Sequence, residues 1–103
     1  MSRWKRLSVR DFKFTKVSVV YRFIDEGTRQ VDTYSDPCIS YCVWDGLTLY
    51  TNEEGVYRLR RNGELLCEGD EFLLACIVAR LKNDKYKERG YSDRAFVIDG
   101  DLS

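Results

Sequence analysis

The sequence has no histidine, a single proline and no long apolar run among its 103 residues. Histidine is the usual general base near neutral pH and a common metal ligand, so its absence argues against most acid–base catalysis and most zinc sites. The longest apolar run is the eight residues from Phe72 to Ala79, well short of the roughly 18 that cross a bilayer. We therefore expect neither a metalloenzyme nor a membrane-spanning protein.

Four cysteines are present, and their spacing does not favour a metal site. The closest two, Cys38 and Cys42, have three residues between them, whereas structural zinc usually takes C-x-x-C pairs. Charged residues interrupt the basic N-terminal stretch where a signal peptide needs an apolar region, so we expect a cytoplasmic protein. We expect Cys42, Cys67 and Cys76 to behave as small buried hydrophobic residues, and we expect no cofactor and no bound metal.

Charge is balanced overall, with 17 basic and 17 acidic residues, but it is divided into blocks. Residues 1–22 carry seven basic residues and one acidic residue, whereas residues 23–57 carry seven acidic residues and one basic residue. If the fold keeps these blocks apart, the protein has a basic and an acidic surface that steer charged partners. If paired strands interleave the blocks, the charges neutralise each other.

Turn residues recur at short intervals and divide the chain into short strands. Asp45-Gly46 and Asn62-Gly63 lie between apolar runs, which is a strong hairpin signal because a type I′ turn needs positive φ at both central residues. The pattern predicts an α+β fold: an antiparallel β-meander sheet of about six to seven strands packed on one α-helix. We expect one domain over 1–103, with a flexible basic arm at 1–12 and a frayed tail at 99–103. The expected strands are 14–24, 29–34, 38–44, 47–52, 56–61, 64–68 and 95–98, and the helix spans about 71–88.

The expected helix begins after Asp70, a good N-cap, and ends before Gly90, a residue that commonly stops helices. At about 100° per residue, its large apolar side chains form one stripe that we expect to face the sheet. The stripe consists of Leu73, Leu74, Ile77, Val78 and Leu81. The other side is either solvated or a face for homodimer formation. That side carries Phe72, Ala75, Cys76 and Ala79.

The two-residue turns also predict which side chains share a face of the sheet. A loop at 45–46 places Tyr41 opposite Tyr50, and a loop at 62–63 places Arg58 opposite Cys67. We therefore expect a basic face with tyrosines on the side of the sheet away from the apolar core. Its candidate partner-binding residues are Tyr41, Tyr50, Arg58, Arg60, Arg22 and Lys16.

Tyrosine and arginine on an open sheet face suit two kinds of partner. Both residues are enriched at protein interfaces, and both stack bases or contact phosphates in single-stranded nucleic-acid platforms. A third interpretation is structural, with tyrosines that stabilise the hairpin and arginines that are merely solvated.

We therefore expect a small non-enzymatic interaction module that acts as an inhibitor, adaptor or regulator by binding a surface of a larger protein. Phages and other mobile elements use compact domains of this kind to block host systems. One alternative is single-stranded nucleic-acid binding through the tyrosine and arginine face. Another is a small enzyme or small-molecule binder whose site is assembled from residues far apart in the sequence.

Overall fold

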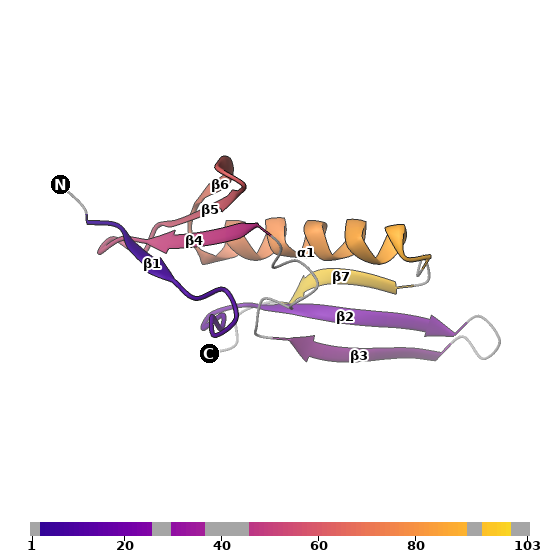
Figure 1. The fold of residues 1–103 in the computed structure, drawn as a ribbon. Coiled ribbons are helices and arrows are strands. Elements are labelled where there is room, and N and C mark those ends of the chain that lie inside the picture. The colour runs from indigo at the N-terminus through magenta and orange to yellow at the C-terminus, as the bar shows by residue number, and fades with distance from the viewer. Residues whose placement is uncertain (1–2, 26–29, 37–45, 91–93, 100–103) are drawn as a thin grey trace.

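The structure, a computed structural model, describes residues 3–25, 30–36, 46–90 and 94–99 of the chain (Figure 1). It contains one long helix and several short strands in this part of the chain. In chain order the elements are β1 (Lys5–Leu7), β2 (Ser18–Asp25), β3 (Gln30–Asp36), β4 (Leu47–Thr51), β5 (Tyr57–Arg61), β6 (Glu64–Gly69), α1 (Glu71–Glu88) and β7 (Arg94–Asp99). No helix in these ranges is both long enough and apolar enough to span a membrane.

The described strands form two antiparallel sheets. A four-stranded sheet has the order β1-β4-β5-β6, and a three-stranded sheet has the order β3-β2-β7. The α+β class is confirmed, with a four-stranded antiparallel sheet packed on one helix, but the predicted single meander of six to seven strands is not. β2 pairs with β3 and β7 in a sheet of their own, and β1, inside the arm expected to be flexible, pairs with the edge of β4 to which the prediction assigns a strand at 38–44. Residues 37–45 lie outside the described residues.

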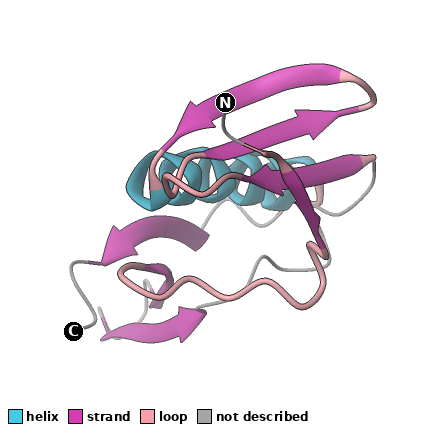
Figure 2. Cartoon of the chain, turned by 90° about the vertical axis from the view of Figure 1, so that its left-hand side faces the viewer, coloured by secondary structure: helices cyan, strands magenta, loops and turns pink. Residues whose placement is uncertain are grey.

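The helix packs against both sheets. It contacts β5 and β6 of the four-stranded sheet and β2 and β7 of the three-stranded sheet. In Figure 2 the strands of the two sheets lie above and below α1. The core lies along these contacts and includes Leu49 and Leu59 from the four-stranded sheet, Val19 from β2, and Leu74 and Val78 from the helix. One helix therefore holds the two sheets together.

The helix boundaries match the sequence prediction because the local signals are strong. The Asp70 side chain accepts a hydrogen bond from the Leu73 backbone N–H at 3.0 Å, as an N-cap does. At the other end Gly90 has φ of +85°, a left-handed conformation that glycine adopts without steric cost. Lys85 and Lys87 lie in the last turn, where positive charge complements the helix dipole.

The buried side of the helix differs from the predicted stripe. Ala75 is 0% exposed and Ala79 is 5% exposed, whereas Leu73 is 39% exposed. Large apolar side chains favour the predicted stripe, but two sheets pack against this helix, and small side chains at the contact let the backbones approach closely. Ala75 and Ala79 are core residues, so both the solvated and the homodimer interpretation of this side are wrong for them. Cys76 is half-buried, and Phe72 is 55% exposed.

A buried carboxylate fixes the chain segment before β2 to the start of the helix. Glu71 Oε1 accepts hydrogen bonds from the Thr15 backbone N–H at 2.8 Å and from the Thr15 hydroxyl at 3.0 Å. Glu71 Oε2 accepts one from the Lys16 backbone N–H at 2.6 Å. These hydrogen bonds compensate the cost of removing the buried Glu71 carboxylate from water. The positive end of the helix dipole stabilises the carboxylate further.

A β-bulge changes the register of the second hairpin. Asn62 and Gly63 both have positive φ, and Arg60 lies opposite Leu65, as a two-residue turn predicts. Beyond that pair the register shifts by one residue. Arg58 therefore lies opposite Glu68 rather than opposite Cys67, and the predicted pairing is wrong at this point. The extra residue of β6 has no paired residue on β5. Because of this shift, the Cys67 side chain lies on the core side of the sheet, where it is buried.

Candidate functional site

A row of polar side chains crosses the four-stranded sheet on the side away from the core. In the sheet register Arg6 of β1 lies beside Tyr50 of β4, Tyr50 lies beside Arg58 of β5, and Arg58 lies beside Glu68 of β6. We call these four residues the outer row. The positions immediately next to them in the chain include Leu49 and Leu59, which are fully buried. Since side chains alternate along a strand, the outer row faces away from the core.

Arg58 is the centre of this row, because it contacts neighbours on two sides. Its guanidinium carbon lies 3.9 Å from the centroid of the Trp4 ring, a cation–π contact. Its Nε and Nη2 donate to Glu68 Oε1 at 3.1 and 2.5 Å. The Arg58 and Glu68 side chains remain 28% and 42% exposed. The two contacts thus hold Arg58 in one orientation while leaving it accessible to a partner.

Contacts of this kind contribute little to stability. An exposed ion pair is worth about 0–1 kcal/mol and an exposed cation–π contact about 0.5–1 kcal/mol. Their effect is orientation, since an arginine held on both sides loses less conformational freedom when a partner binds. The cluster of Trp4, Tyr50 and Arg58 therefore presents a pre-ordered surface.

The structure brings together only part of the predicted site. Tyr50, Arg58 and Arg60 share the outer side of the four-stranded sheet, and Arg60 Nη1 donates to the Gly63 carbonyl oxygen at 3.3 Å. Lys16 lies elsewhere, where its backbone N–H binds Glu71. Arg22 belongs to β2 in the other sheet. Tyr41 lies outside the described residues, and both places beside Tyr50 are taken by Arg6 and Arg58.

Sequence reasoning missed Trp4, Arg6 and Glu68. A signal for the first two was present: in a strand, Trp4 and Arg6 are two residues apart and share a face, and both types are enriched at interfaces. A flexible arm, which the basic composition of this stretch favours, has no such alternation. No comparable signal was present for Glu68, because its place beside Arg58 depends on the bulge.

Two groups near the core have altered acidities. Burial raises the pKa of Tyr57, and the negative charge of Glu71 raises it further. Burial also raises the pKa of the Cys67 thiol, although a backbone hydrogen bond at Leu59 opposes this effect. Both shifts favour the neutral form, which is the inert form for a thiol. The expectation that Cys67 acts as a buried hydrophobic residue is confirmed.

The described residues do not assemble a metal site: no group of three or more Cys, Asp or Glu side chains among them is placed to hold an ion. Comparison with protein-family models, with curated protein sequences and with solved structures gave no match. The geometry of the described residues is therefore the basis on which function is inferred.

Proposed function

We propose that this chain is a non-enzymatic protein-interaction module, and that it binds a larger protein through the outer row and Trp4. One observation carries the proposal: Arg58 is stacked on Trp4, paired with Glu68 and placed beside Tyr50, all on one sheet face. Tryptophan, tyrosine and arginine are the residues that dominate binding energy at protein interfaces. By occupying a surface of its partner, the module acts as an inhibitor, adaptor or regulator.

The same contacts favour a protein over single-stranded nucleic acid. A platform for bases needs aromatic rings whose faces are open for stacking. Here the Arg58 guanidinium lies over the Trp4 ring, and Glu68 offsets the charge of that arginine. A carboxylate beside the central arginine repels phosphates, whereas at a protein interface it accepts hydrogen bonds from the partner.

Affinity purification with paired variants tests the proposal. The wild-type protein, Arg58→Ala and Arg80→Ala are immobilised, and the proteins retained from the native host are identified by mass spectrometry. Arg80 is a matched control because it is exposed on α1, which packs on the other face of the sheet. We expect one stoichiometric partner that binds Arg58→Ala at least about fivefold more weakly, or more than about 1 kcal/mol, and binds Arg80→Ala as it binds the wild type. Equal binding by all three proteins would refute the role of the outer row.

One feature supports the nucleic-acid alternative. The two strands on either side of Tyr50 carry Arg6, Arg58 and Arg60. Fluorescence anisotropy with labelled oligothymidylate at 50 and 200 mM salt separates the two functions. Phosphate-driven binding weakens steeply over this range because counterions are released. We expect no saturable binding at either salt concentration. Binding that falls with salt and disappears in an Arg58→Glu/Arg60→Glu variant would replace the protein partner with a nucleic acid.

A further inference from the structure

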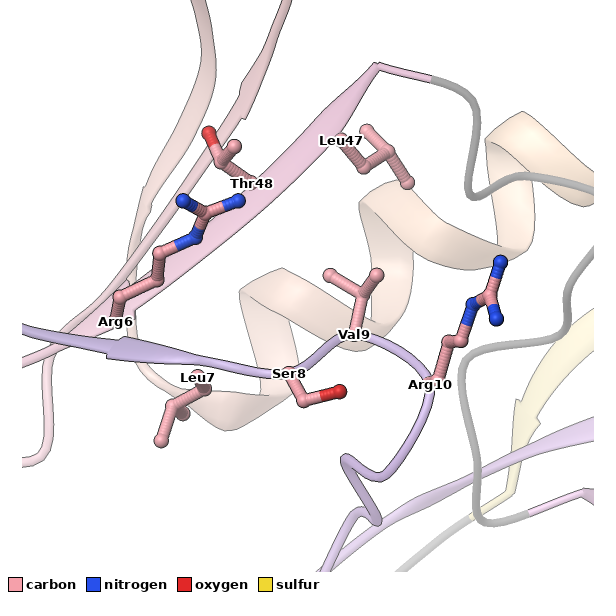
Figure 3. Close-up of a pocket in the computed structure, with 7 residues that line it drawn as sticks. All are labelled: Arg6, Leu7, Ser8, Val9, Arg10, Leu47 and Thr48. Carbon is pink, nitrogen blue, oxygen red and sulfur yellow. The ribbon is translucent and has the colours of Figure 1, made fainter.

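A hollow of about 460 Å³ lies between the end of β1, the turn that follows it and the start of β4 (Figure 3). Its size is within the roughly 300–1,000 Å³ of sites that hold small ligands or side chains. Its lining residues are Arg6, Leu7, Ser8, Val9, Arg10, Leu47 and Thr48. The hollow thus adjoins the outer row, to which Arg6 belongs.

The hollow has an apolar floor and polar sides. Leu47 is a core residue, and Val9 is partly buried and packs against the core. In Figure 3 their side chains point toward one another, with the Arg6 and Thr48 side chains on one side and Arg10 on the other. Ser8 is exposed and adds a second hydroxyl. A ligand that fills this space therefore meets apolar atoms below and hydrogen-bond donors beside it.

The charged residues in the described lining of the hollow are all basic. Two arginines line it, and none of its described lining residues is acidic. A second hollow of about 330 Å³, beside the start of the helix, is mainly acidic, with Glu54, Asp70 and Glu71 against a single basic residue, Lys16, in its described lining. The guanidinium fork matches carboxylates in geometry as well as charge. The first hollow is thus complementary to an anionic group that is attached to an apolar one.

We infer that this hollow binds a short acidic segment of the protein partner, with an apolar side chain on Leu47 and Val9 and carboxylates beside Arg6. The inference depends on the proposed function, because Arg6 joins the hollow to the same face. A small inorganic anion pairs with Arg6 but leaves the apolar floor in water. A peptide with an apolar residue between acidic residues satisfies both.

The probe is the acetylated, amidated tripeptide Asp-Phe-Glu, titrated into the isotope-labelled full chain and followed by NMR. We expect saturable shifts of the amide signals of Ser8, Val9 and Thr48. The tripeptide Lys-Phe-Lys and inorganic phosphate serve as controls and should give no saturable shifts there. Absence of saturable binding by Asp-Phe-Glu, or equal shifts with phosphate alone or with oligothymidylate, would overturn the inference.

Two substitutions at one exposed position separate charge from shape. Ser8→Glu places a carboxylate in the hollow, and we expect it to weaken Asp-Phe-Glu binding at least about tenfold, since like charges at an interface repel. Ser8→Lys adds a side chain of similar length with the opposite charge, and it should bind the peptide at least as tightly as the wild type. Equal weakening by both variants would show that the side chain only obstructs the space, and would overturn the assignment to an acidic ligand.

The captured partner then distinguishes failure of this inference from failure of the proposed function. If Arg58→Ala weakens partner binding but Ser8→Glu does not, the outer row binds the partner and the hollow does not. If neither variant weakens it, the proposed function itself fails. Weakening by both variants, with Ser8→Lys unchanged, supports both proposals.

Discussion

Two rows of side chains cross the same four strands one residue apart, and they have opposite chemistry. The outer row is Arg6, Tyr50, Arg58 and Glu68. The inner row is Leu7, Leu49, Leu59 and Cys67. The inner row belongs to the apolar cluster that packs with the helix, whereas the outer row makes ion-pair and cation–π contacts. The same strand pairing carries both rows. Whether a residue contributes to stability or to recognition therefore depends on the side of the sheet to which its side chain points.

The comparison predicts that neighbouring substitutions have different effects. A change in the inner row removes buried apolar contacts and leaves a cavity. A change in the outer row removes partly exposed contacts and alters binding.

Leu59→Ala should cause the largest loss of stability. Leu59 is 0% exposed and lies in the middle of the inner row. Leucine-to-alanine substitutions in cores cost about 2–5 kcal/mol, because transfer free energy is lost and a cavity remains. Urea denaturation measures the change, and the neighbouring Arg58→Ala is the matched control, with an expected loss below about 1 kcal/mol. Similar losses for both would mean that the two rows are not energetically distinct.

Glu71→Gln should have the next largest effect. Gln has nearly the same shape, but it replaces one acceptor oxygen with an NH2 group, which cannot accept the hydrogen bond that this oxygen receives from Thr15 or Lys16. Leaving such a buried group unsatisfied costs about 1–3 kcal/mol. Glu88→Gln, at the exposed end of the same helix, should change the free energy of unfolding by no more than about 0.5 kcal/mol. If Glu71→Gln is equally harmless, the bonds to residues 15 and 16 do not hold the segment.

The Cys67 thiol provides a chemical test of the inner row. Its pKa is raised by burial, so less thiolate is present at pH 8 than on an ordinary cysteine, and reagents reach it poorly. Cys76, on the helix, is half-buried. We expect iodoacetamide to modify Cys67 at least about tenfold more slowly than Cys76, a difference of about 1.4 kcal/mol in activation free energy. Peptide mapping by mass spectrometry measures both rates in one sample, and addition of urea should make them converge.

The helix and most strands could be predicted because their signals are local. Asp70 and Gly90 mark the helix ends, and the Asn62-Gly63 turn defines one hairpin. The register beyond that turn could not be predicted. Leu65 and Leu66 are both apolar, so the sequence does not indicate which of them is the extra residue of the bulge. The position of Glu68 beside Arg58, on which the candidate site depends, follows from that choice.

Non-local packing accounts for the other differences. Ala75 and Ala79 of the helix are buried because two sheets pack against it. The sequence near Ala75 does not indicate that a second sheet contacts the helix. Likewise, β1 pairs with a strand about 40 residues later in the chain. The part of the site that was predicted, Tyr50 with Arg58 and Arg60, depends only on alternation within neighbouring strands. Trp4 and Arg6 join it through the long-range pairing.

Tyr57→Phe should have the smallest effect, and it should appear only at alkaline pH. Tyr57 ionises less readily in the folded state than in the unfolded state, where its pKa is near 10.0. The folded pKa is the higher one, so the contribution to stability is complete below pH 10 and is lost as pH rises through the folded value. Urea denaturation at pH 8 and pH 11 should therefore show a larger fall for the wild type than for Tyr57→Phe, by a fraction of about 1 kcal/mol because the side chain is partly exposed. Equal falls would mean that neither burial nor the charge of Glu71 acts on this hydroxyl. The Tyr57 hydroxyl would then be more open to water than its contacts imply.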